Sequence, residues 1–275
     1  MMSVASAIFG YYSATPDRNP PEFIGLLTGT ALAASGCAAL NQWMESREDS
    51  LMERTATRPI PSGDVKPSHA LWIGIVISIL GLGILATWTN PWATLLTAGV
   101  LFSYLALYTP MKKTTPLSTE VGAVSGALPP LLGYVAATGA VWGPESLNGW
   151  VLFGILFAWQ MPHFMAISFM HSKDYKEAGF RMLVHEENGA KRSARKSLFY
   201  TILLVALTFL PVWIPGNKVS NWYLILNTLL SIYALVHAIR FLSPQKKESH
   251  ARSLFYCTIL YLPVFMLLFA MDRYL

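Results

Sequence analysis

The residues best suited to chemistry lie in the stretch Asn41–Gly63, NQWMESREDSLMERTATRPIPSG. Asn41, Glu45 and Asp49 are spaced i, i+4, i+8, so on a helix their oxygen-bearing side chains share one face. This set suits a hard cation such as Mg²⁺, which binds carboxylates together with phosphate oxygens of a substrate. Arg54 and Arg58 follow at the same spacing, within reach of such phosphates. A solvated helix end held by Glu–Arg pairs is the plainer interpretation of these charges.

A second polar set lies in the stretch FAWQMPHFMAISFMHSKDYKEAGFRML. Gln160, His163, Ile167 and Asp174 form one stripe if the helix continues past Pro162. Polar side chains within a membrane helix are costly and usually face a cavity or a partner, which favours a functional role for Gln160 and His163. A Gln–His pair that joins helices is the structural alternative. Asp174 is either a second cation ligand or an ordinary loop aspartate.

A third segment, Tyr108–Lys113 (YTPMKK), ends another apolar run. Lys112 and Lys113 are either anchors at a membrane interface or phosphate-binding groups that face the Asn41–Asp49 set.

The elements that must position these residues are membrane helices. Hydrophobic residues make up 53% of the chain and charged residues 13%, which is far from the composition of a soluble domain. We predict an all-α, polytopic bundle of nine transmembrane helices in one integral-membrane domain, residues 1–275, with a short first helix. The predicted spans are Met1–Ser13, Phe23–Met44, His69–Thr87, Trp92–Tyr108, Thr119–Ala137, Trp150–Met170, Ser197–Ile214, Asn221–Phe241 and Ser253–Ala270. Cys37 and Cys257 both lie inside apolar runs, with neither a metal-binding nor a redox spacing.

The basic residues predict the orientation of the bundle. All of the 20 lysines and arginines except Arg18, Lys218 and Arg273 lie in or beside the loops between spans 2 and 3, 4 and 5, 6 and 7, and 8 and 9. The positive-inside rule places these loops, and the N-terminus, in the cytoplasm and the C-terminus outside. The positive net charge therefore reflects membrane topology, and nothing indicates nucleic-acid binding.

Taken together, these residues predict a Mg²⁺-bound diphosphate at the cytoplasmic mouth of an apolar cavity, with an isoprenoid tail between the helices. Metal and cationic side chains would neutralise the leaving group, and aromatic walls such as Trp159 and Phe164 would shield the resulting cation. A transporter for an organic anion is the alternative from another class, although it has less need of clustered acidic ligands.

The motifs resemble those of the UbiA superfamily of intramembrane prenyltransferases. Asn41–Gly63 is similar to the NxxxDxxxDxxMxRTxxRPLxxG signature of that superfamily. YTPMKK, GALPPLLGY at Gly126–Tyr134, FAWQMPHF at Phe157–Phe164 and DYKEAGFRML at Asp174–Leu183 resemble the branch that farnesylates heme.

The resemblance implies a nine-helix bundle with a central cavity that opens to the cytoplasm or matrix. It implies transfer of farnesyl from farnesyl diphosphate to a vinyl group of heme B, with addition of water, to give heme O. The implied ligands of Mg²⁺-diphosphate are Asn41, Glu45, Asp49 and Asp174. The implied substrate-binding residues, which include a heme contact at His163, are Arg54, Arg58, Tyr108, Lys112, Lys113, Gln160 and His163.

The chain departs from the superfamily pattern at two positions. Glu45 stands where many members have aspartate, and Ala178 stands where the quinone enzymes have a second aspartate. Prenylation of a quinone precursor or of a chlorophyll-type tetrapyrrole is the alternative within the superfamily. The expected surroundings are the lipid bilayer of a bacterial cytoplasmic membrane, with a downstream heme-modifying enzyme or terminal oxidase assembly as a further candidate partner.

Overall fold

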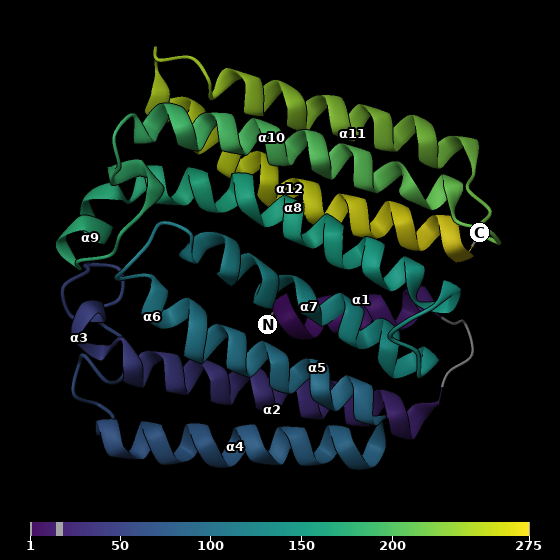
Figure 1. The fold of residues 1–275 in the computed structure, drawn as a ribbon, viewed down its shortest axis with the longest axis horizontal. Coiled ribbons are helices and arrows are strands. Elements are labelled where there is room, and N and C mark those ends of the chain that lie inside the picture. Colours follow the sequence, from purple (N-terminus) through teal and green to yellow (C-terminus); the bar gives the residue numbers. More distant parts are fainter. Residues whose placement is uncertain (1, 15–18, 275) are drawn as a thin grey trace.

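The computed structural model describes residues 2–14 and 19–274, and Arg18, which the topology prediction used, lies outside them. These residues form helices and no strands. The long helices run side by side as one antiparallel bundle (Figure 1). Their bounds are α1 Met2–Ala14, α2 Pro20–Met44, α4 Pro67–Trp88, α5 Pro91–Phe102, α7 Ser118–Thr138, α8 Leu147–Met170, α10 Gly189–Phe209, α11 Asn221–Arg240 and α12 Lys247–Tyr274.

Short elements complete or connect these helices. A π-helical segment, η1 (Ser103–Tyr108), and the short helix α6 (Thr109–Met111) extend α5 without a break. The remaining short helices are α3 (Ser46–Asp49), η2 (Pro144–Ser146), α9 (Ser172–Glu177), η3 (Leu183–His185) and η4 (Leu210–Trp213).

The described part of the chain contains 8 helices that are long and apolar enough to cross a membrane, and α1 with 13 residues is the ninth member of the bundle. The prediction of an all-helical membrane bundle with a short first helix is therefore confirmed. The helices α10 and α12 begin at Gly189 and Lys247, earlier than the predicted Ser197 and Ser253. Lysine and arginine favour helix and extend their charged ends to water, so these basic segments continue the apolar helices.

Helix α1 is held by close backbone packing, although it is too short to span the bilayer. Figure 1 shows it beside α7 in the middle of the bundle. A Cβ atom on Gly10 would lie 1.9 Å from the backbone oxygen of Pro130, and one on Gly133 would lie 1.8 Å from the oxygen of Ala7. Small residues that let helix backbones approach this closely are typical of membrane interfaces.

Helices α7 and α8 form the centre of the bundle. Of their most apolar segments 67% is buried, against 17–39% for the other spans. The outer helices expose large apolar side chains, such as Trp72, Ile79, Phe199 and Ile225, as expected of a surface in contact with lipid.

The segments that carry the polar motifs gather at one end of the bundle. There α3 follows α2, α6 ends the α5 segment and α9 follows α8 (left in Figure 1). We call this the polar end, and the candidate site lies beside it.

Candidate functional site

The first polar motif begins where α2 ends. The helix stops at Met44, and Glu45 adopts φ −104° and ψ 13° before α3 begins. The expected single helix through Asp49 is thus interrupted at Glu45. The hydrogen bonds between residues four positions apart are nevertheless kept. The amide of Glu45 donates to the oxygen of Asn41 at 2.9 Å, and the amide of Asp49 donates to the oxygen of Glu45 at 2.8 Å. The Asn41 side chain donates from Nδ2 to Glu45 Oε2 at 3.0 Å, so these two predicted ligands are in contact.

The acidic groups of this motif are buried and paired with basic groups. Glu45 is 3% exposed and Asp49 is 1% exposed. Lys112 Nζ lies 2.8 Å from Glu45 Oε1, and Arg58 donates from Nη1 to both oxygens of Asp49 at 2.7 and 2.9 Å. Buried carboxylates need such partners, because desolvation of an unpaired charge is costly. The structure therefore unites four of the predicted residues in two ion pairs.

Glu48 is a member of the site that the sequence analysis missed. It is buried, and its Oε1 pairs with Lys113 Nζ at 2.7 Å. Its other oxygen, Oε2, is buried with no hydrogen-bond partner among the described residues. Its position in the sequence could have indicated this role. Glu48 lies i+7 from Asn41 and i+3 from Glu45, which places it on the same helical face.

The second polar motif is divided between two helices. Helix α8 continues through Pro162 but ends at Met170, so Asp174 lies on α9 and not on the stripe that carries Gln160 and His163. Asp174 is partly exposed and lies 3.5 Å from His171 Nδ1. Across residues 2–14 and 19–274, no three His, Cys, Asp or Glu side chains are grouped so that they could hold a metal ion, so Asp174, Glu45 and Asp49 do not form a ready metal cluster.

The two motifs nevertheless meet through an apolar cluster. Met52 packs against Ala178, Phe180 and Met182, which follow α9. Gly179 makes the intervening turn with φ +77°, a conformation that favours glycine. This cluster holds the loop after α9 against the loop after α3.

Polar contacts between the motifs add to this cluster. The backbone amide of Arg181 donates to the oxygen of Lys112 at 2.7 Å. Arg54 donates from Nη2 to Tyr175 OH at 2.9 Å, and its guanidinium lies 4.9 Å from the centre of the Tyr175 ring. Arg54 thus contacts a neutral side chain, whereas Arg58, Lys112 and Lys113 pair with carboxylates.

The π-helical segment η1 directs tyrosine side chains toward the same region. Tyr104 and Tyr108 lie with their ring centres 5.0 Å apart, and Lys112 Nζ lies 4.5 Å from the centre of the Tyr108 ring. The Thr109 hydroxyl donates to the oxygen of Tyr104 at 2.9 Å and accepts from Asn41 Nδ2 at 3.1 Å. Segments of this kind are frequent at functional sites. Thr109 was not predicted, because its role depends on this irregular turn.

Two cavities lie next to this charged cluster. The small-residue chamber, of about 280 Å³, lies between α2, α5 and α7 and is lined by residues such as Ala33, Cys37, Ala38, Thr97 and Leu132. The aromatic chamber, of about 350 Å³, is lined by residues that include Tyr104, Tyr108, Trp159, Gln160, His163 and Phe164. Tyr104 and Gly126 line both chambers.

Gln160 joins α8 to α7 at the wall of the aromatic chamber. Its Nε2 donates to the oxygens of Leu156 at 3.2 Å and Ala123 at 3.3 Å. A Cβ atom on Gly126 would lie 2.2 Å from Gln160 Oε1, so the glycine makes room for this side chain. These contacts support the helix-joining interpretation for Gln160, which also lines the chamber.

His163 is clamped between helices α8 and α12. Its ring stacks with that of Trp159 and with that of Phe255, with ring centres 5.1 Å apart in each pair, and its Nδ1 lies 2.9 Å from Thr258 Oγ1. Trp159 Nε1 donates to the backbone oxygen of Thr258 at 2.7 Å. Phe255 and Thr258 were missed, because the helix that carries them shows no polar motif.

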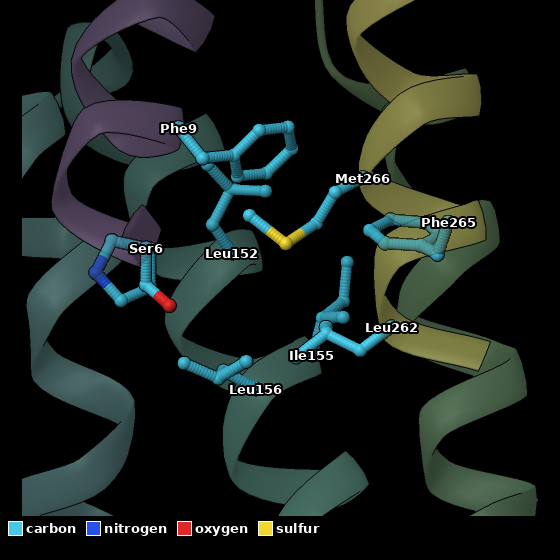
Figure 2. A pocket seen from close by; sticks show the side chains of 9 residues that line it. Ser6, Phe9, Leu152, Ile155, Leu156, Leu262, Phe265 and Met266 are labelled. Atoms are coloured by element: carbon cyan, nitrogen blue, oxygen red, sulfur yellow. The ribbon is translucent and has the colours of Figure 1, made fainter. Parts of the chain in front are cut away.

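A further cavity, shown in Figure 2, lies between α1, α8 and α12. Its labelled lining, which includes Phe9, Ile155, Leu262 and Met266, is apolar apart from Ser6. Its volume is about 10 Å³, which is close to the space for one water molecule. It is too small for a substrate, unlike the small-residue and aromatic chambers, which lie next to the charged cluster.

The donor set of the first motif fits a hard cation. Asn41, Glu45 and Asp49 offer oxygen ligands, and Glu48 Oε2 adds a buried carboxylate oxygen that lacks a partner. Lys112, Lys113, Arg54 and Arg58 supply positive charge beside them for an anion that accompanies the cation.

Comparison with known proteins agrees with this geometry. Residues 3–262 match the UbiA prenyltransferase family. The chain is 41% identical over 275 residues to the protoheme IX farnesyltransferase of Opitutus terrae, covering 99% of this chain and 90% of that protein. It is 37% identical to the protein of the same name from Aquifex aeolicus, covering 93% and 85% of the two chains.

Solved structures share the fold at low sequence identity. A digeranylgeranylglyceryl phosphate synthase structure superposes with a TM-score of 0.82 at 19% identity, covering 98% of this chain and 92% of that one. A UbiA homologue from Archaeoglobus fulgidus bound to DMAPP and Mg²⁺ superposes with a TM-score of 0.72 at 15% identity, covering 99% and 93%. The bundle is therefore the fold of these membrane proteins.

Proposed function

The chain belongs to the UbiA prenyltransferase family, and we propose that it transfers a farnesyl group from farnesyl diphosphate to a vinyl group of heme B. Water adds in the same reaction, and the products are heme O and diphosphate. The observation that carries this proposal is the similarity of nearly the whole chain to enzymes named protoheme IX farnesyltransferase. The charged cluster beside two chambers supports it, because the reaction needs a diphosphate site that reaches both a lipid tail and an acceptor.

The first motif is the proposed site of the diphosphate. Lys112 and Arg58 neutralise Glu45 and Asp49 in the structure. When a magnesium diphosphate enters, the carboxylates gain the cation and the basic groups gain the phosphate oxygens, so each charge exchanges one partner for another. Mg²⁺ bound there supplies charge neutralisation of the leaving diphosphate. Asn41 completes this ligand set, while Arg54 and Lys113 hold further phosphate oxygens.

Asp174 is the proposed ligand of the second motif. It lies on α9, beside the loop that the Met52 cluster holds against the first motif. A modest closure of this loop on substrate would bring its carboxylate toward the diphosphate. Its side chain is partly exposed, and in the described part of the chain its carboxylate pairs with His171.

The two chambers suit the farnesyl chain and the allylic cation that forms from it. The small-residue chamber starts one turn before Asn41, at Cys37 and Ala38, and so continues the diphosphate site into an apolar channel for the farnesyl chain. Tyr104 lines both this channel and the aromatic chamber, and Tyr108 lines the aromatic chamber, where ring faces favour a nearby allylic cation.

The bonds that change follow from this arrangement. The carbon–oxygen bond of the diphosphate breaks, and the allylic carbon bonds to the terminal carbon of the vinyl group. The cation left on the porphyrin side chain takes an oxygen from water, which releases a proton. Apolar walls exclude water until the carbon–carbon bond has formed.

The orientation is part of the proposal. The basic residues of the loops at the polar end support a cytoplasmic position for it and for the N-terminus, with the C-terminus outside. We place this single membrane domain in the cytoplasmic membrane of a bacterium. A downstream heme-modifying enzyme or an oxidase assembly would receive the product.

An acceptor competition tests the function. Purified protein in detergent is given farnesyl diphosphate, Mg²⁺, heme B and a quinone precursor such as hydroxybenzoate or naphthoate, and each extracted acceptor is weighed by mass spectrometry. We expect prenylated heme and an unchanged aromatic acid. Prenylation of the aromatic acid with unchanged heme would assign the protein to the quinone enzymes instead.

A further inference from the structure

The position of His163 suggests a specific contact with the acceptor. The ring lines the aromatic chamber, and it stacks with the rings of Trp159 and Phe255. A histidine that served only to join helices would need one hydrogen bond, whereas this ring is held in position and orientation by Trp159, Phe255 and Thr258. Side chains of functional sites are typically held in one orientation by their neighbours in this way, so that the functional atom points in one direction.

The hydrogen bonds around Thr258 determine which ring nitrogen carries the proton. The Thr258 hydroxyl has one hydrogen and donates it to the backbone oxygen of Phe255 at 2.7 Å. Its oxygen therefore accepts at 2.9 Å from Nδ1 of His163, which must carry the ring proton. The neutral ring then has a lone pair on Nε2. Within the described residues no hydrogen bond to Nε2 is present, so this lone pair is available to a ligand in the chamber.

Nδ1 bonded to a protein oxygen with a free Nε2 is the arrangement by which proteins prepare histidine to bind a metal. Heme B, the acceptor of the proposed function, would bring iron to His163 if the aromatic chamber receives it. We infer that His163 Nε2 is an axial ligand of the heme iron, and that Thr258 is a positioning residue which holds the ring in the required tautomer. This inference rests on the proposed function, because it assigns a contact to that acceptor.

As an iron ligand, His163 would orient the porphyrin as well as bind it. His163 on α8 and Tyr108 on η1 line the same chamber, and Tyr108 contacts Lys112 of the diphosphate site. An iron atom fixed at Nε2 therefore places the rim of the porphyrin between these walls, where a vinyl group can meet the allylic carbon. Specificity for heme over an aromatic acid would follow, since the aromatic acid has no metal to bind.

The test compares heme B with metal-free protoporphyrin IX. Both are titrated into the full-length protein in detergent, and absorption and resonance Raman spectra report the iron ligand. We expect a histidine-ligated spectrum in the unaltered protein, lost in His163→Ala. The heme affinity should fall by more than about tenfold, because loss of even an outer-shell partner costs about 10–100-fold. The affinity for metal-free porphyrin should not change by a comparable factor.

Two further variants separate ligation from packing. Thr258→Val keeps the shape of the side chain but removes the acceptor for Nδ1, and we expect a weakened iron–histidine band and about a tenfold loss of heme affinity. His237→Ala removes another histidine of a membrane helix, which lies against Tyr233, and it should leave the spectrum unchanged. Free imidazole added to His163→Ala should restore the histidine-type spectrum, because the slot between Trp159 and Phe255 is then vacant.

The outcomes distinguish this inference from the proposed function. If His163→Ala binds heme with an unchanged spectrum, or if its affinity falls equally for heme and for metal-free porphyrin, then His163 is not the iron ligand. The proposal of heme farnesylation would still stand. If the unaltered protein binds no heme under conditions in which it binds farnesyl diphosphate, both the ligation and the proposed acceptor are wrong.

Discussion

Lys112 Nζ lies 2.8 Å from the carboxylate of Glu45, although 67 positions separate these residues in the sequence. The pair joins the end of α2 to the end of the α5 segment, beside the Tyr108 ring. Both side chains are largely buried, with 12% and 4% of their surface exposed. The pair thus joins one positive and one negative group of the kinds that a magnesium diphosphate would use.

Replacing Lys112 by Met should destabilise the substrate-free protein. Breaking a buried ion pair leaves an uncompensated charge, which costs roughly 3–5 kcal/mol. Thermal unfolding in detergent measures the loss. If a magnesium diphosphate exchanges partners with this pair, added Mg²⁺ and farnesyl diphosphate should recover part of it, because the cation replaces the lost charge on Glu45.

Lys173→Met is the control for that experiment. Lys173 pairs with Glu177 at 3.8 Å, and both side chains are exposed, so its loss should cost less than about 1 kcal/mol. Equal destabilisation by both variants, with no recovery on adding substrate, would contradict the exchange of ion pairs.

Asp49→Asn should remove most of the activity while the protein stays folded. The amide keeps the shape and can still contact Arg58, but it loses the charge that a cation needs. We expect kcat to fall by about 10²–10³, the range found when one electrostatic contact to a transition state is removed. Initial rates of heme prenylation measure it, with the folded state confirmed by circular dichroism.

Glu177→Gln provides the comparison for Asp49. This exposed residue of α9 pairs with Lys173 at 3.8 Å, outside the first motif, so its neutralisation should leave kcat unchanged. Near-normal turnover of Asp49→Asn would exclude Asp49 from the metal site.

Removal of Mg²⁺ should affect the diphosphate site without affecting heme binding. The proposed ligands Asn41, Glu45 and Asp49 lie in the first motif, whereas His163 faces the aromatic chamber. We expect EDTA to stop prenyl transfer while the heme dissociation constant stays the same, and Mg²⁺ to restore the rate. Parallel titrations with and without EDTA check this, and loss of heme binding on chelation would show that the metal site and the heme site are not separate.

Gly133→Ala should destabilise the bundle. The new Cβ atom would lie 1.8 Å from the backbone oxygen of Ala7, which cannot move without shifting α1. Overpacking of this kind costs about 1–3 kcal/mol or more. Gly99→Ala is the control, because its Cβ meets no atom within 4 Å, and a stabilisation of about 0.5–1 kcal/mol is expected from the better helix former. Unfolding temperatures in one detergent compare the two, and equal values would contradict the tight α1–α7 contact.

The sequence predicts the bundle well because lipid imposes simple rules. A span needs a long apolar run, and this requirement located the helices from α2 to α12, including the kink-prone α7 with its internal prolines. The short α1 could also be predicted, but not its place in the bundle, since that depends on the glycine contacts with α7.

The candidate site was only partly predictable. Spacing on an ideal helix grouped Asn41, Glu45 and Asp49, although the real helix is interrupted at Glu45. No sequence pattern predicted the contacts between segments that are distant in the chain. Thr258 and Phe255 reach His163 from α12, and Thr109 reaches Asn41 through a π-helical turn, so three-dimensional packing alone reveals them. Asp174 was expected on the stripe of α8, but the helix break at His171 moves it to α9.

The most direct measurement follows the mass of the acceptor. Purified protein is incubated with heme B, farnesyl diphosphate and Mg²⁺ in water enriched in the heavy oxygen isotope, and the extracted heme is weighed. The account predicts a heme heavier by one farnesyl group and one water that carries the heavy oxygen. Release of diphosphate with a heme of unchanged mass would contradict it.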